Sequence, residues 1–245
     1  MEHPIFKVMA ASTLTLVLAA CGGGGSSSNN NLQPGDNTEG NDAASGGVQY
    51  SMTFDQTWSG ATFPTNYPSS AHFSPLVGAT HNSQVVIWRP QDQPSTAGLE
   101  IVAESGSTST FTMELEEHRS SGYVDEIFRH GGPEDSPGSQ QVMFTATEQF
   151  PLVSAVSMIA PSPDWFVGVR DVNLYPNGEW VDRLEFDLRL YDSGTDLAEQ
   201  FTASNNDGGD RIITLVSTDA IDTDFANGVH RSSGAFVGRI IIERQ

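Results

Sequence analysis

The sequence predicts an all-β protein of sandwich or barrel type with at most one or two short helices. Short apolar runs alternate with polar residues, as they do in half-buried strands, and clusters of Gly, Pro, Asn and Asp separate the runs. Gly (24) and Pro (13) are plentiful in the 245 residues, which favours many turns over long helices. Because each sheet must bury its apolar face, many short strands favour two packed sheets or a closed barrel.

The clearest strand is predicted at residues 184–190, where Leu184, Phe186, Leu188 and Leu190 face one way and charged residues the other. The same alternation, or a β-branched run, predicts strands at 48–54, 111–115, 142–146, 212–216 and 240–242. One short helix is predicted at 97–104, because three apolar residues there share a helical face.

The charge balance is strongly acidic. The chain has 31 Asp and Glu against 11 Lys and Arg, a formal net charge of -20. Such a surface repels phosphate backbones, so nucleic acid is excluded as an expected partner. It attracts divalent cations and basic patches instead, although acidity of this kind also serves solubility alone.

The N-terminus has the features of an export signal. Lys7 precedes an apolar run at 8–20, which is shorter than the roughly 20 residues of a membrane span. The sequence Leu-Ala-Ala-Cys at 18–21 resembles the processing box of bacterial lipoproteins, and that resemblance implies lipidation of Cys21 after cleavage. By similarity to Gram-negative lipoproteins, Gly22 in place of Asp implies the outer membrane, on its periplasmic or surface-exposed side. The alternative is an incidental thiol in an ordinary cleaved leader.

Three segments are therefore predicted: a signal peptide at 1–20, a lipidated cysteine with a flexible tether at 21–47, and a folded domain at 48–245. The tether is rich in Gly, Ser and Asn and almost free of apolar residues, so burial cannot offset the entropy of ordering it. Contact with a membrane is expected through the lipid anchor only. Cys21 is the only cysteine, which excludes an intrachain disulfide.

Two acidic turns are candidates for a metal site. Asp164 follows two prolines and precedes an apolar strand, while Asp192 and Asp196 flank a turn that contains Gly194. Carboxylate and carbonyl oxygens at strand ends suit calcium, which takes 6–8 oxygen ligands. Glycine gives the turn freedom to bring the two side chains together. The alternative is a capped turn whose aspartates accept hydrogen bonds from nearby amides.

Longer motifs carry a family resemblance. VSAVSMIAPSPDWFVGV at 153–169 and YDSGTD at 191–196 resemble the two signatures of the spondin domain, the second with Ser193 where Ala is usual. That domain occurs in the F-spondins, in mindin and in bacterial secreted proteins. Further matches lie at 57–59, 67–68, 71–82 and 97–104, and the similarity extends from about residue 50 to 217.

The resemblance implies a C2-like antiparallel β-sandwich that holds one calcium ion (Ca2+) at one end. By motif position the implied metal ligands are Asp164, Asp192 and Asp196. It also implies a non-catalytic adhesion or interaction domain whose partner is a protein or glycan at the cell surface or matrix. The acidic stretch at 219–224 departs from the pattern, and the cysteines of the animal domains are missing.

Other candidate groups are expected to be structural. His72 and His81 are nine residues apart and are interpreted as satisfied histidines, with metal binding or catalysis as the alternative. Four tryptophans are expected to pack in the core rather than to form a carbohydrate platform: Trp58, Trp88, Trp165 and Trp180. No nucleophile elbow, zinc-protease helix or phosphate loop is present. An exported hydrolase with an unrecognised site and a purely structural envelope lipoprotein stay open as alternatives.

Overall fold

The computed structural model describes residues 46–64, 67–91, 93–198, 200–208, 212–215 and 236–245. The predicted signal peptide, Cys21 and nearly all of the tether lie outside these residues, as does the acidic stretch at 219–224. Within the described part of the chain, no helix is long and apolar enough to cross a bilayer.

Two antiparallel sheets form the domain, which confirms the predicted all-β sandwich. The first has the strand order β6 (Gly138–Ala146), β1 (Val48–Gln56), β12 (Gly238–Arg244) and β9 (Arg183–Leu188). The second has the order β11 (Thr214–Leu215), β10 (Tyr191–Asp192), β8 (Trp165–Asn173), β7 (Leu152–Ala160), β2 (His72–Phe73) and β5 (Glu134–Asp135). In addition, β3 (Val77–His81) pairs with β7 and with β4 (Val124–Arg129).

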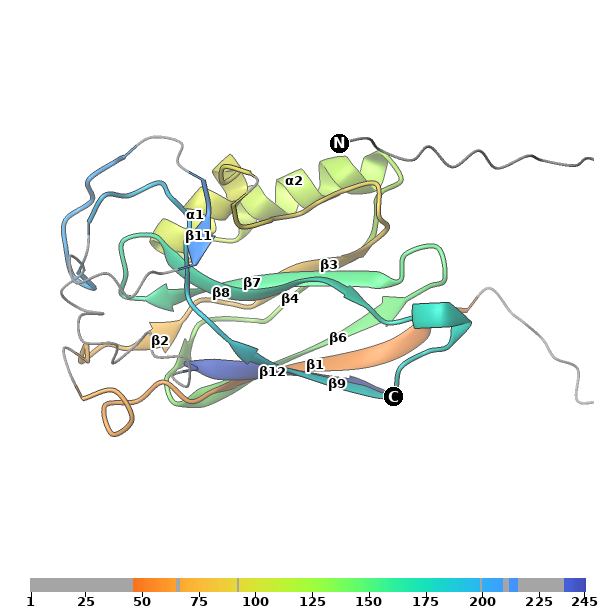
Figure 1. Ribbon diagram of the computed structural model, residues 1–245, viewed down its shortest axis with the longest axis horizontal. Coiled ribbons are helices and arrows are strands. Elements are labelled where there is room, and N and C mark those ends of the chain that lie inside the picture. The colour runs from red at the N-terminus through yellow and green to blue at the C-terminus, as the bar shows by residue number, and fades with distance from the viewer. Residues whose placement is uncertain (1–45, 65–66, 92, 199, 209–211, 216–235) are drawn as a thin grey trace, which may run out of the picture. The chain divides into compact units, whose positions relative to one another are not determined.

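Helices α1 (Ala97–Ser105) and α2 (Ser109–Ser120) cover the outer face of the second sheet, as Figure 1 shows. One hydrophobic cluster lies between the sheets and includes Phe54, Phe144 and Val167. A second lies between the second sheet and the helices and includes Leu99 and Phe166. Both faces of the second sheet are thus buried, which explains why β7 is buried continuously from Val153 to Ala160 instead of at alternate residues.

One strand prediction is wrong. Residues 111–115 belong to α2, in which Phe111 and Leu115 are buried while Met113 between them is 59% exposed. Positions i and i+4 share a helix face, so a five-residue alternation also fits one helical turn. The following Glu116 and Glu117 are weak strand formers, and they extend the helix to Ser120.

The other predicted elements are found. The predicted helix at 97–104 is α1, with Thr96 as its N-cap: the Thr96 hydroxyl accepts a hydrogen bond from the amide of Leu99. Strands occupy 48–54, 142–146 and 240–242 as predicted. The strand predicted at 184–190 is β9, which ends at Leu188, so the last two predicted residues lie outside it. At 212–216 only the two residues of β11 are in strand conformation among those described.

Gly78 in β3 allows close contact between three strands. A Cβ atom at this position would lie 2.3 Å from the carbonyl oxygen of Ser154 and 2.8 Å from the Phe128 ring. We expect Gly78→Ala to lower the free energy of unfolding by about 1–3 kcal/mol, because the added methyl overpacks a fully buried site. Urea denaturation measures the effect. The control is Gly131→Ala, at a position where no atom lies within 4 Å of the added Cβ; equal stability of the two variants would contradict the prediction.

Candidate functional site

Asp164 lies at the start of β8, in a turn that its sequence shapes. The two prolines disfavour helix in the residues before them, and Ser162 Oγ accepts a hydrogen bond from the Trp165 amide at 3.2 Å. The side chain of Trp165 is buried and packs edge-on against Phe201, with ring centroids 5.4 Å apart. This packing holds the turn against the core, and the Asp164 side chain has no exposed surface.

Strand β10 brings the second acidic turn alongside. Asp192 pairs with Trp165 in antiparallel register, and the Ser193 amide donates to the carbonyl oxygen of Asp164 at 3.0 Å. Gly194 adopts φ 81°, the left-handed region that favours glycine. This bend lets Asp192 Oδ1 accept a hydrogen bond from the Gly194 amide at 2.8 Å.

The Asp164 carboxylate is the point at which the two turns meet. Its Oδ2 atom accepts hydrogen bonds from the amides of Thr195 (2.8 Å) and Asp196 (3.1 Å) and from the Ser193 hydroxyl (3.0 Å). Its Oδ1 atom is buried and has no hydrogen-bond partner among the residues that the structure describes. An acceptor buried without a partner costs free energy, so half of this carboxylate is left for a donor or a cation.

Asp196 is also buried, with 3% of its surface exposed. Its Oδ1 accepts from the Ala198 amide at 2.7 Å and its Oδ2 from the Asn206 amide at 3.1 Å. The structure therefore brings the loops of Asp164, Asp192 and Asp196 together, with each carboxylate bonded to turn amides. Among the described residues, no three Asp, Glu, His or Cys side chains already stand in an arrangement that could hold a metal ion.

Burial raises the pKa of Asp164 above its ordinary value, and the negative charge of Asp196 raises it further. The hydrogen bonds from the Asp196 and Thr195 amides and from the Ser193 hydroxyl act in the opposite direction. Two buried carboxylates that repel each other make a site in which a cation is stabilising.

Sequence reasoning missed a further acidic residue, Glu104 at the end of α1. Its carboxyl group accepts a hydrogen bond from Thr195, and burial together with the charges of Glu100, Asp164 and Asp196 raises its pKa. The only sequence signal was its place in the 97–104 motif, which does not show that α1 reaches the turn after β10. Glu104 adds negative charge beside the two buried aspartates.

The structural interpretation of the histidines is supported. His81 is fully buried, its Nε2 lies 2.8 Å from Ser154 Oγ, and burial lowers its pKa. His72 and His81 pair with opposite ends of β7, at Ala160 and Leu152, so they are roughly 25 Å apart and share no site.

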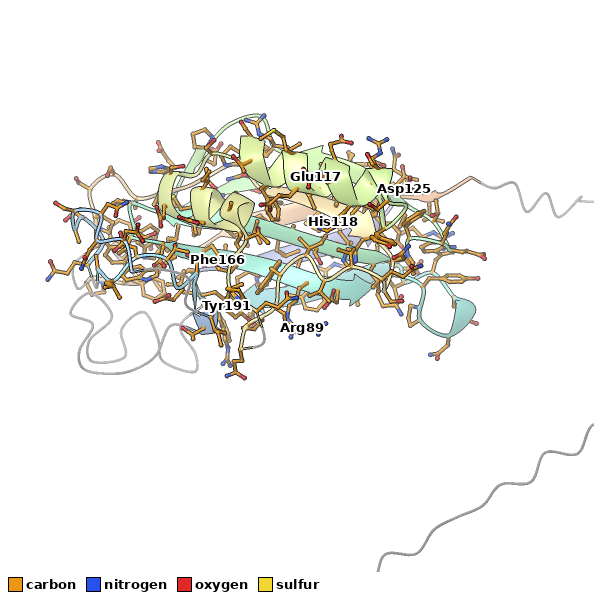
Figure 2. The ribbon with its side chains drawn as sticks, turned by 90° about the horizontal axis from the view of Figure 1, so that it is seen from above. Arg89, Glu117, His118, Asp125, Phe166 and Tyr191 are labelled. Carbon is orange, nitrogen blue, oxygen red and sulfur yellow. The ribbon has the colours of Figure 1, made fainter. Side chains whose placement is uncertain are left out.

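The tryptophans pack in the core as predicted. Trp58, Trp88 and Trp165 are at most 2% exposed, and Trp180 is partly buried against the cluster between the sheets. Figure 2 shows Phe166 and Tyr191 near Arg89 on one flank of the second sheet. The rings of Phe166 and Tyr191 are stacked with centroids 5.6 Å apart, and Trp88 contacts both edge-on. None of these four tryptophans presents a flat exposed platform.

Comparison with known proteins agrees with the resemblance. The family model described as Spondin_N matches residues 48–230. Spondin-2 of Homo sapiens is 34% identical over 162 residues, which cover 64% of this chain and 49% of that protein. Spondin-1 of Rattus norvegicus is 30% identical over 211 residues, which cover 82% of this chain and 26% of that protein.

The chain thus spans about half the length of Spondin-2 and about a quarter of Spondin-1. The region matched by the family model contains β1, β6 and β9 of the first sheet, all strands of the second sheet and all three aspartates of the acidic turns, while β12 lies beyond it. On the length and order of this match, the chain belongs to the spondin N-terminal family.

Proposed function

We propose that this protein is a non-catalytic interaction domain whose loops are organised by one calcium ion held by Asp164, Asp192 and Asp196. The observation that carries the proposal is the Oδ1 atom of Asp164, which is buried and has no hydrogen-bond partner within the described part of the chain. A bound cation would give this oxygen a partner and would offset the repulsion between Asp164 and Asp196. Oxygen ligands of this kind suit calcium in preference to softer metals.

The charge around the turns supports the same assignment. Asp164 and Asp196 are buried close together, and Glu104 lies near both. Calcium also coordinates main-chain carbonyl oxygens, which the turns at this end of the sandwich offer. The Asp192 and Asp196 carboxylates are tied to amides of their own turns, so we expect them to reorient when the ion binds.

The proposed role is adhesion or recognition. Neutralising the carboxylates lets the loops at this end of the sandwich take one conformation, and a protein or glycan at the cell surface or matrix recognises them. We further propose that Cys21 carries lipid and anchors the domain to the outer membrane of a Gram-negative bacterium. The anchor would place a binding domain at the cell periphery.

Calorimetric titration with calcium tests the site. We expect the wild-type chain to bind one calcium ion per chain and Asp164→Asn to bind none under the same conditions, because the amide removes the charge but keeps the size. The matched control is Asp182→Asn, which makes the same chemical change in a side chain that is 91% exposed. Calcium binding by Asp164→Asn equal to that of the control would contradict the proposal, and so would absence of binding in the wild type.

A further inference from the structure

One edge of β8 is only partly paired with a neighbouring strand. The chain passes from β9 in the first sheet to β10 in the second. Of the residues of β8, only Trp165 and Phe166 pair with β10. From Val167 onward, β8 pairs with β7 on one side, and within the described residues no strand pairs with the other side.

The main-chain groups of two β8 residues face this uncovered side. The Ser193 amide donates to the Asp164 carbonyl, so Asp164 and, two residues later, Phe166 direct their main-chain groups toward β10. Hydrogen-bonding direction alternates along an antiparallel strand. Gly168 and Arg170 therefore direct their N–H and C=O groups to the same edge of β8, beyond the end of its pairing with β10. The register shift opposite Val153–Ala155, together with φ 50° at Asp171, ends this free edge.

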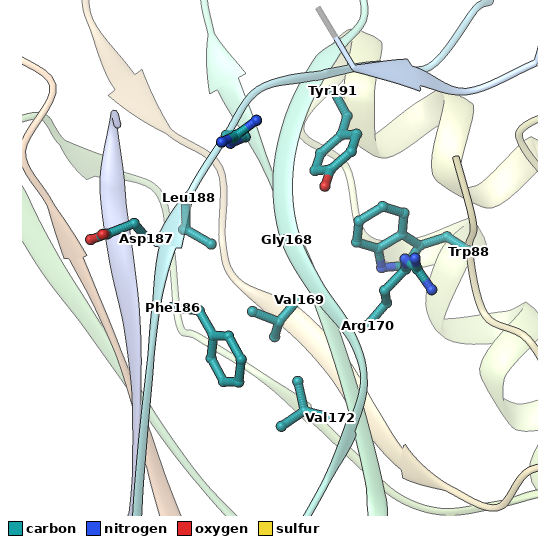
Figure 3. Close-up of a pocket in the computed structure, with 10 residues that line it drawn as sticks. Trp88, Gly168, Val169, Arg170, Val172, Phe186, Asp187, Leu188 and Tyr191 are labelled. Carbon is teal, nitrogen blue, oxygen red and sulfur yellow. The ribbon is translucent and has the colours of Figure 1, made fainter. Parts of the chain in front are cut away.

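A groove of about 280 Å³ runs along the same edge (Figure 3). Gly168, Val169 and Arg170 all line it. Consecutive strand residues point to opposite faces of a sheet, so a pocket lined by all three lies along the edge of the strand and not on one face. Phe186 and Leu188 of β9 line the other side of the groove, as Figure 3 shows.

The lining of the groove combines apolar and cationic side chains. Val169, Val172 and Phe186 form the apolar wall. Arg170 and Arg189 line the same groove. Among the described residues Arg189 makes no ion pair and lies 5.9 Å from the centroid of the Phe236 ring.

The acidic neighbours do not cancel this charge. Asp171 is shared between Arg170 at 3.3 Å and Arg89 at 3.5 Å. Asp187 also lines the groove, but in Figure 3 its side chain points away from Phe186 and Val169, and its carboxylate lies 3.9 Å from Arg239 Nε. Because charges farther than about 10 Å are largely screened at moderate salt, the groove is locally cationic although the chain is strongly acidic overall.

We propose that this groove binds an extended peptide segment of a partner protein with alternating apolar and acidic residues, which adds to β8 as a short strand. The peptide backbone pairs with Gly168 and Arg170. Its apolar side chains enter the wall formed by Val169, Val172 and Phe186, and its acidic side chains pair with Arg170 and Arg189. Strand addition of this kind draws affinity from main-chain hydrogen bonds and specificity from alternate side chains. None of the three aspartates lines the groove, so the inference goes beyond the proposed calcium site.

The first test is an NMR titration of the full chain with the peptide acetyl-Val-Asp-Val-Asp-Val-amide. We expect saturable shifts of the Gly168 and Arg170 amide signals. Two N-methylated versions separate strand pairing from other binding: methylation of the amides on one peptide edge is expected to abolish binding, and methylation on the opposite edge to leave it intact. Equal binding of both versions, or shifts of the same signals by free glutarate alone, would overturn strand addition in favour of a simple anion site.

Charge reversal is the second test. We expect Arg170→Glu with Arg189→Glu to bind the acidic peptide about tenfold more weakly, as two lost exposed ion pairs imply, and to bind acetyl-Val-Lys-Val-Lys-Val-amide in its place. The control is Arg119→Glu with Arg129→Glu, the same charge change at two exposed arginines outside the groove. Failure of the reversed variant to change its preference, or an equal loss in the control, would contradict the proposal.

Discussion

Calcium at about one hundred times its dissociation constant is expected to raise the melting temperature of this protein by about 5–10 °C. A ligand that binds only the native state at that excess stabilises by about 2.7 kcal/mol. One kcal/mol shifts the melting temperature of a domain of about 200 residues by about 2–4 °C. The gain arises because the ion removes the repulsion between Asp164 and Asp196, and because it provides a partner for the buried Oδ1 atom.

Differential scanning calorimetry in chelator and in millimolar calcium measures this shift. Magnesium at the same concentration is the control, since it demands a smaller octahedral site and dehydrates reluctantly. We expect it to give a much smaller shift. Identical melting curves in chelator and in calcium would count against the calcium site, and they would leave the sandwich fold unaffected.

Strands with one buried face were predictable from the sequence. In β9 and β1, apolar residues alternate with polar ones over five or more positions, and a period of two identifies a strand at that length. Residues 111–115 fit two kinds of element. Their alternation is as regular, but it ends after five residues, where a single helical turn fits it equally well. Only the packing of Phe111 and Leu115 against the second sheet decides between the two.

The acidic turns were predictable in part. Proline and glycine around Asp164 and Asp192 indicated bends at strand ends, and the family motifs identified the three aspartates. The sequence could not show that the Asp164 carboxylate accepts the amides of Thr195 and Asp196. Those bonds depend on the register between β8 and β10, in which Asp192 pairs with Trp165, a residue far from it in the chain.

The role of Glu104 and the cationic groove were less predictable than the acidic turns, because both depend on contacts between distant segments. Glu104 contributes to the acidic site only because α1 packs across the second sheet and ends beside Thr195. The groove exists because the chain crosses from β9 in the first sheet to β10 in the second. Since β10 pairs with β8 only at Trp165 and Phe166, the edge of β8 that follows Phe166 stays uncovered. Neither event has a local sequence pattern, since each is set by where distant segments meet.

Replacement of Asp164 by alanine is expected to lower the free energy of unfolding by about 2–6 kcal/mol even in chelator. The amides of Thr195 and Asp196 both donate to Asp164 Oδ2 in a buried site. Each buried donor left without its acceptor costs about 1–3 kcal/mol. The Ser193 hydroxyl adds little to the loss because it has Thr195 Oγ1 at 2.7 Å as a second partner.

Asparagine at position 164 separates the two proposed roles of this carboxylate, which are to accept hydrogen bonds from the turn and to bind calcium. In chelator we expect Asp164→Asn to stay within about 1 kcal/mol of the wild type, because an amide oxygen still accepts both N–H groups and the repulsion from Asp196 is removed. Calcium should leave the free energy of unfolding of Asp164→Asn unchanged, whereas it should raise that of the wild type by about 2.7 kcal/mol at one hundred times its dissociation constant. Urea denaturation of both variants, with and without calcium, gives the four free energies required. If the asparagine variant lost as much stability in chelator as the alanine variant, the charge of Asp164 would itself support the fold, and repulsion could not be the force that calcium relieves.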